Sequence, residues 1–181
     1  MPPIVSADQL CVALEDTLKT HLVATMATLG YVDDDYDRIK TWQQVPTLAA
    51  LTTAQLPGIA IASPGLVAPP SYSAASGTYT ATWRLAVGIY VRGRDHADTQ
   101  ARTRNWCAGI RLTALGHKSL GGVAKRTTWT GEEYADRPGR ETARTLAGGV
   151  VALNVTADLI ADPTAGNLPP VTSTPTSVSV Q

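Results

Sequence analysis

The longest regular pattern in the chain is an alternation of apolar and other side chains between positions 79 and 92. One set of alternate positions is apolar, whereas the other set mixes threonine, arginine, alanine, glycine and tyrosine. The apolar set is Tyr79, Ala81, Trp83, Leu85, Val87, Ile89 and Val91. Because successive side chains of a strand point to opposite faces, this pattern predicts a long, half-buried β-strand.

A different period occurs near the start of the chain, where large apolar residues recur every four residues and finally after three. They are Leu10, Leu14, Leu18, Leu22, Met26 and Leu29. This spacing places them along one side of a helix. Ser6 and Gln9 fit a capping box at its start, and Gly30 supplies a stop at its end. We therefore expect a helix over 6–29 whose single apolar stripe lies on a sheet or on a neighbouring subunit.

A second helix is predicted directly after the long strand, with only Gly93 as a break. Asp95 can cap the free N–H groups at its start, and Gly116 can end it. Asp98 and Arg102 are four residues apart and can form an ion pair on its surface. Its apolar side is expected to consist of Ala97, Ala101, Ala108, Leu112 and Leu115, widened by Trp106 and Ile110.

Three more strands are predicted from shorter apolar patterns. They cover residues 58–62, 123–134 and 145–157. The first is expected to stop at the Ser-Pro-Gly sequence of residues 63–65, because proline and glycine favour turns. The segment 66–77 is rich in proline, serine and glycine and predicts an exposed loop. Residues 135–140 are polar and predict a turn.

These elements predict an α/β (α+β) fold with long polar loops, in which two main helices pack on a central, mainly antiparallel four-stranded sheet. A chain of 181 residues with 44% hydrophobic content supports one core, which we assign to a single domain over 1–162. Residues 163–181 are rich in proline, threonine and serine. They contain too little apolar material to offset the entropy of ordering, which predicts an extended, flexible C-terminal tail.

The overall charge favours no particular partner, because 15 basic and 15 acidic side chains cancel. This balance gives no support to nucleic acid, a membrane surface or a strongly acidic substrate as the ligand. Cys11 and Cys107 lie among apolar neighbours in the two helices and are interpreted as buried thiols. The start of the chain does not resemble a secretory signal, and no apolar run approaches the ~20 residues of a membrane span. We expect the protein to be made and kept in a cytoplasm, or in a particle assembled there.

The motifs that carry common enzyme chemistry are missing. The strand-to-helix join offers Gly93 alone, whereas a dinucleotide site needs three glycines in a fixed spacing. The sequence Gly-His-Lys-Ser at 116–119 lacks the first glycine of a P-loop, because position 111 is arginine. His21, His96 and His117 stand far apart, with no cysteine or carboxylate at ligand spacing. We therefore expect no catalytic residue, no cofactor and no metal ion; a site assembled from distant residues is the alternative.

Two clusters of charge remain. Asp33, Asp34 and Asp35 form an acidic segment, for which a solvated turn is favoured over a calcium site because the glycine and distal glutamate of an EF-hand loop are missing. The basic cluster consists of Arg92, Arg94, Arg102, Arg104 and Arg111. A solvated, ion-paired face is its favoured interpretation, and a surface between subunits is the next. Phosphate contacts are a weaker alternative, since no aromatic platform is interleaved with the arginines.

The order of these elements resembles the tail terminator proteins of long-tailed bacteriophages, in which a small α/β subunit forms a ring that caps the tail tube. The stretches that carry the resemblance are the helix over 6–29, TYTATWRLAVGIYVRGRDHADTQARTRNWCAGIRL and TLAGGVVALNVTAD. The resemblance is one of element order and not of a short motif. The tail over 163–181 departs from the compact plan of that family.

The resemblance implies a structural virion protein of the tail and neck region, assembled in the host cytoplasm, which catalyses nothing. Its partners would be further copies in a homohexamer, tail-tube subunits and a head-tail connector or stopper protein. DNA would pass through the lumen as cargo, and no membrane is involved. The alternatives are another neck protein, for head-tail joining or tail completion, and a small enzyme with a site of scattered residues.

Rotational rings use a heterologous interface, in which two different patches meet. We hypothesise that the acidic segment containing Asp33, Asp34 and Asp35 faces a surface containing Arg92 and Arg94 across this interface.

Overall fold

The computed structural model of the chain describes residues 5–31, 38–44, 52–73, 78–137 and 146–159, and the statements below concern these residues. The helices are α1 (Ala7–Thr28) and α2 (His96–Gly116), with short 3-10 turns η1 (Thr53–Gln55) and η2 (Leu120–Gly122). The strands are β1 (Thr41–Gln43), β2 (Gly58–Leu66), β3 (Ser71–Ser73), β4 (Thr78–Arg92), β5 (Arg126–Arg137) and β6 (Leu146–Leu159). The tail predicted over 163–181 lies outside the described residues.

The strands form one sheet in the order β1-β2-β4-β6-β5, and β3 pairs with β4 beyond the end of β2. Every pairing is antiparallel except that of β1 with β2. The predicted mixed fold, with two helices on a mostly antiparallel sheet, is confirmed. The described residues form six strands instead of four, because the segments 41–43 and 71–73 add two short strands that carry no clear alternation.

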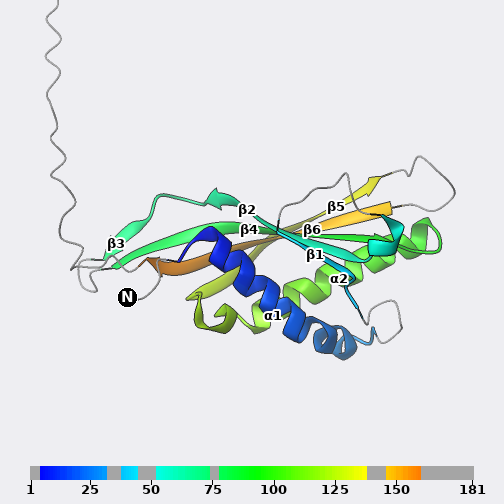
Figure 1. The fold of residues 1–181 in the computed structure, drawn as a ribbon, viewed down its shortest axis with the longest axis horizontal. Coiled ribbons are helices and arrows are strands. Elements are labelled where there is room, and N and C mark those ends of the chain that lie inside the picture. Colours follow the sequence, from blue (N-terminus) through cyan, green and yellow to red (C-terminus); the bar gives the residue numbers. More distant parts are fainter. Residues whose placement is uncertain (1–4, 32–37, 45–51, 74–77, 138–145, 160–181) are drawn as a thin grey trace, which may run out of the picture.

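Both helices lie on the same side of the sheet, which leaves the other side without a helical layer in the described part of the chain (Figure 1). The alternation of β4 explains this arrangement, because its apolar positions from Ala81 to Val91 are all buried. The opposite face carries short polar groups that bond to one another. Thr82 and Thr156 share a hydrogen bond of 2.9 Å, and Thr80 donates one of 2.9 Å to Asp158. The core therefore fills one side of the sheet only.

Helix α1 has the ends and the buried stripe that the sequence predicts. The capping box is present, since the Gln9 amide donates to Ser6 Oγ at 3.2 Å and the Ser6 amide donates to Gln9 Oε1 at 3.0 Å. Gly30 follows the helix with a φ of +83°, a conformation that glycine adopts at little cost. Leu10, Leu14, Leu18, Leu22 and Met26 are buried, whereas Leu29 is partly exposed.

Helix α2 begins as predicted, with the Asp98 amide donating to Asp95 Oδ1 at 2.8 Å. Its buried side is predicted only in part, because Trp106 and Ile110 are buried as expected, whereas Ala97, Ala101 and Leu112 are exposed. The buried side consists of Thr99, Arg102, Thr103, Trp106, Cys107, Gly109, Ile110, Thr113 and Ala114.

Small and hydroxyl-bearing residues on this side let α2 approach its neighbours closely. The Thr103 hydroxyl donates to the Thr99 carbonyl at 2.9 Å, so it is buried without losing its hydrogen bond. Gly109 lies against Leu22 and Met26 of α1, where a Cβ would meet the Leu22 side chain at 3.3 Å and overlap the Met26 sulfur. Hydrophobicity alone therefore misplaces the contact face of this helix.

Strand boundaries differ from the prediction at turn-forming residues. Strand β2 continues through residues 63–65 by a β-bulge between Ala62 and Gly65, and the Ser63 hydroxyl donates to the Arg84 carbonyl at 2.9 Å. Pro64 favours the end of a strand in the sequence, but a bulge accommodates a proline without ending the pairing of the strand. The predicted loop over 66–77 contains β3. Strand β5 begins at Arg126 and includes 135–137, so it is shifted toward the C-terminus.

Replacing Gly149 of β6 by alanine is expected to destabilise the protein by about 1–3 kcal/mol. A Cβ at this position would overlap Cys107 Sγ and lie 3.0 Å from Thr103 Cγ2, so α2 has to move away from the sheet. Gly131→Ala on β5 is the matched control, because a Cβ there meets nothing within 4 Å. Urea denaturation measures both variants. Equal free energies of unfolding for the two variants would contradict the close contact between Gly149 and α2.

Candidate functional site

The join between β4 and α2 is a packed corner. A Cβ on Gly93 would lie 2.6 Å from both Asp98 Oδ2 and the Thr99 amide nitrogen, so only glycine fits. The Gly93 amide donates to Thr99 Oγ1 at 2.9 Å, and the Arg94 amide donates to Asp98 Oδ2 at 2.7 Å. The donors that a phosphate group would use in a nucleotide site are thus occupied by side chains of α2.

Asp98 carries the negative charge of this corner. Arg102 donates to its Oδ1 at 2.9 Å, which confirms the predicted pair, and Arg94 Nε lies 3.7 Å from its Oδ2. The hydrogen bond from the Arg94 amide and the nearby Arg102 guanidinium hold the pKa of the Asp98 carboxyl below its ordinary value. Asp98 therefore stays ionised and fixes the turn from strand to helix.

The arginine cluster is divided between internal pairs and free surface. Arg102 pairs with Asp98, and Arg111 Nη1 lies 2.6 Å from Glu132 Oε1, which fits an ion-paired face. The Arg94 side chain is 85% exposed. The Nε atom of Arg92 is buried and has no hydrogen-bond partner in the described part of the chain. Asp33, Asp34 and Asp35 lie outside the described residues, so their contact with Arg92 and Arg94 stays a prediction.

An exposed aromatic surface follows the free edge of the sheet. We call it the β5 edge and define it by Arg111, Leu112, Trp129, Glu132 and Tyr134. Its three apolar members, Leu112, Trp129 and Tyr134, are exposed by 42%, 45% and 46%. Among the described strands β5 pairs with β6 alone, so the opposite side of β5 has no neighbouring strand in the described part of the chain. Interface cores are enriched in tryptophan, tyrosine and arginine, which makes the β5 edge a candidate contact surface.

Internal bonds hold the side chains of the β5 edge in fixed positions. The Arg111 guanidinium lies 5.0 Å from the centre of the Trp129 ring, within the range of a cation–π contact. The Tyr134 hydroxyl donates to Glu132 Oε2 at 2.5 Å. Partial burial and this bond to a carboxylate raise the pKa of Tyr134 to about 12, so the hydroxyl remains a donor at neutral pH. A partner meets a preorganised surface here and loses little side-chain entropy.

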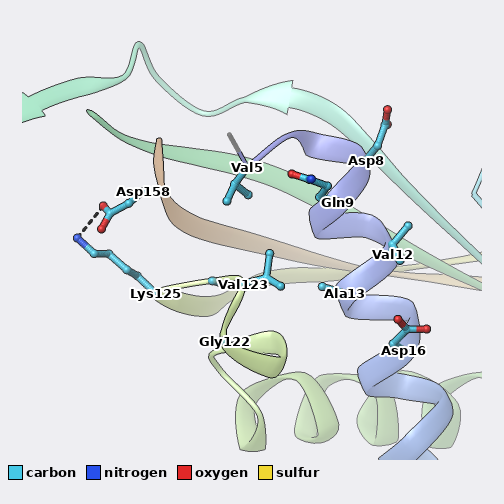
Figure 2. Close-up of a pocket in the computed structure, with 11 residues that line it drawn as sticks. Val5, Asp8, Gln9, Val12, Ala13, Asp16, Gly122, Val123, Lys125 and Asp158 are labelled. Carbon is cyan, nitrogen blue, oxygen red and sulfur yellow. Dashed lines mark ion pairs between the residues drawn. The ribbon is translucent and has the colours of Figure 1, made fainter. Parts of the chain in front are cut away.

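A second surface feature is a groove of about 660 Å³ between the start of α1 and the segment that leads into β5. Figure 2 shows Val5, Gln9 and Ala13 on one side of this groove and Gly122 and Val123 on the other. Val12 and Val123 line it and are exposed, although both are apolar. The groove therefore has an apolar lining that the described residues leave uncovered.

Charged groups surround the groove. Lys125 Nζ lies 2.7 Å from Asp158 Oδ1 at one end, and this pair is marked in Figure 2. Asp8 and Asp16 of α1 lie along the other side. The bonds from Lys125 and Thr80 hold the pKa of the Asp158 carboxyl below its ordinary value. Three carboxylates against one ammonium group make the rim negative, which disfavours an acidic ligand.

Two histidines that are far apart in sequence stack on one another. The ring centres of His21 and His117 are 3.7 Å apart, and the ring planes differ by 12°. The stack joins the middle of α1 to the end of α2 beside Thr17 and Ser119. Parallel rings direct their in-plane nitrogen lone pairs away from a common point, so this pair does not chelate a metal ion.

The described residues hold no group of three or more His, Cys, Asp and Glu side chains that could bind a metal ion. Cys11 and Cys107 are buried free thiols, as the sequence predicts. Burial raises the pKa of Cys11 to about 11 and that of Cys107 to about 12. Both thiols are protonated at neutral pH and are poor nucleophiles. Neither described helix is long and apolar enough to cross a membrane.

The β5 edge, the groove and the histidine stack are not predicted from the sequence. The sequence pattern places Trp129 and Tyr134 in a strand but does not predict which face they share, because the bulge between Trp129 and Gly131 shifts the alternation of β5. The only sequence signal for the groove is Val12, an apolar residue that lies outside the leucine stripe of α1. The stack carried no signal, since its two rings meet only through the packing of α1 on α2.

Comparison of the sequence with models of known protein families gave no match. Comparison with curated proteins gave no match either.

Replacing Asp98 by asparagine is expected to cost about 1–2 kcal/mol of stability at pH 7, because two charge-assisted bonds are lost. The pKa of Asp98 is lower in the folded chain, so its contribution is complete above the ordinary value of 3.8 and is lost as the pH falls through the folded pKa. The difference between the wild type and Asp98→Asn should therefore shrink below about pH 4. Thermal unfolding from pH 7 to pH 2.5 measures this difference. The exposed Asp16→Asn is the control, and a difference that is independent of pH would contradict the assignment.

Proposed function

We propose that this protein is a structural virion component that assembles into a homohexameric ring, caps the tail tube of a long-tailed phage and joins it to the head-tail connector. The phage setting rests on the order of the elements, which resembles tail terminator proteins. The self-association rests on one observation of the structure, the exposed and preorganised β5 edge. The subunit supplies contact surfaces in this proposal and performs no reaction.

The β5 edge supports self-association because a bare edge strand with exposed aromatic residues is a liability in a monomer. Unpaired backbone groups and large apolar side chains at a sheet edge promote aggregation unless another surface covers them. Trp129 and Tyr134 are held in place by Arg111 and Glu132, so they are ordered before a partner arrives. A ring uses this property, since each subunit covers the edge of the next.

The rest of the fold supplies a rigid frame for such a contact. Strands β4, β6 and β5 contain 15, 14 and 12 residues and pair side by side in this order, with β5 at the border of the sheet. The side chains of β4 and β6 toward the helices belong to the core, and β5 pairs along β6, so the β5 edge is attached to a well-packed part of the molecule. Contact at the β5 edge therefore fixes the orientation of the neighbouring subunit, which ring closure requires.

The purified chain is expected to elute at about six chain masses and to form rings in negative-stain images. Replacing Trp129 by alanine should shift the population to monomers, because a central aromatic contact of an interface typically contributes 2 kcal/mol or more. Light scattering coupled to gel filtration measures the mass of both proteins.

Tyr72→Ala is the matched control, because Tyr72 is exposed by 57% on β3, away from the β5 edge. It should leave the mass unchanged. A wild-type chain that is monomeric at every concentration would refute the ring. A ring that survives Trp129→Ala but not Tyr72→Ala would place the interface elsewhere.

The predicted ion pairs across the interface are tested by charge reversal. Asp34→Arg and Arg94→Asp should each weaken assembly, and the double variant should recover part of the loss, because opposite charges face each other again. Sedimentation velocity measures the three variants at low ionic strength, where screening is weak. Additive losses in the double variant would contradict this pairing and leave the β5 edge unaffected.

A further inference from the structure

The apolar groove beside α1 has no occupant in the described residues, and its lining is unusual for a solvent-exposed hollow. Val5, Val12, Ala13 and Val123 line it from two sides. Val12 and Val123 belong to the exposed large apolar residues of the chain, and both lie in this one groove. Contiguous exposed apolar surface with a polar rim marks a binding site in soluble proteins.

The end of β6 lies at the rim of the same groove. Asp158 closes one end of the groove by its ion pair with Lys125 (Figure 2). The described part of the chain ends one residue later, at Leu159. Residues 160–181 therefore start at this rim. A segment that is tethered so close has an effective concentration in the millimolar range, which makes weak docking contacts sufficient.

The composition of this segment matches the groove. No charged side chain follows Asp162, so residues 163–181 are not repelled by the negative rim formed by Asp8 and Asp16. The segment contains Leu-Pro-Pro-Val at 168–171, in which two prolines favour an extended polyproline II conformation and reduce the entropy lost on docking. Leu168 is nine residues beyond Leu159, a distance that the extended chain spans with about 30 Å of reach.

We propose that the C-terminal segment of the same chain docks in this groove, with Leu168 and Val171 against the apolar lining formed by Val12 and Val123. Residues 163–167 cross the rim and contain a proline and a glycine, which allow the chain to turn back after β6. This inference goes beyond the proposed function and does not depend on ring formation. It gives the tail a binding site on its own domain.

Limited digestion of the full chain with elastase, which cleaves after small apolar residues, tests the docking. A free segment with a Kd of about 0.1 mM and an effective concentration of about 1 mM would be docked for about nine tenths of the time. Cleavage after Val171 should then be about tenfold slower in the wild type than in the double variant Val12→Asp/Val123→Asp. Cleavage after Val178, which lies beyond the docked part, should be the same in both proteins.

Val23→Asp is the matched control, because Val23 is exposed on α1 outside the groove. It should cleave like the wild type. Equal cleavage after Val171 in the wild type and the groove variant would overturn the proposal. Protection that falls on dilution would also overturn it, since the occupant would then be the tail of a second copy.

A second measurement leaves the groove itself intact. The tail variant Leu168→Asp/Val171→Asp in the full chain should shift the backbone amide NMR signals of groove residues such as Gln9, Ala13 and Ala124, and leave those around His117 unchanged. Unchanged signals in the groove would show that it is empty or holds another occupant, such as residues 1–4, and would refute the assignment. Circular dichroism checks that all variants keep the wild-type fold.

Discussion

The close approach of α2 to the sheet and to α1 is the constraint on which the structure depends. It rests on two glycines that face the helix layer, Gly149 in β6 and Gly109 in α2, where a side chain would collide with Cys107 or with Met26. Interiors are packed to crystal-like density, so these contacts fix the distance between the layers. Gly149 is paired with Ile89 of β4 and Tyr134 of β5, so this close contact joins α2 to all three strands that lead to the β5 edge.

Much of the fold could be predicted because local signals and tertiary packing agree. The leucine stripe of α1 and the alternation of β4 each follow one periodicity without interruption. The capping box of α1 and the Asp95 cap of α2 mark where the two helices begin. The buried side of α2 could be predicted only in part, because Trp106 and Ile110 lie there among threonine, glycine and a paired arginine. The hydrogen bond of Thr103 and the Asp98–Arg102 pair form within the helix, but which side of the helix is buried depends on close contacts such as those of Gly109, which arise when α2 packs on α1.

The same distinction applies to the candidate surfaces. The Asp98–Arg102 pair was predictable because both residues lie on one helix at a spacing of four. Arg111 and Glu132 are as closely paired, but they come from α2 and β5 and meet through the fold alone. Like the Arg111–Glu132 pair, the β5 edge and the groove are formed only by the folded chain. They combine side chains from elements that sequence reading treats separately, and bulges such as the one at Trp129 change which side chains share a face.

The two borders of the sheet are unequal, and this inequality limits how copies can join. Opposite β5, the border consists of β1, with three residues in parallel pairing, of the bulged strand β2 with Pro64, and of the three-residue β3. None of these described segments offers a long straight template for β5 of another molecule. Edge-to-edge hydrogen bonding of the sheets of many molecules into a fibre is therefore disfavoured. In the proposed ring, neighbouring subunits would therefore recognise one another through side chains, whose shapes permit a closed and countable number of copies.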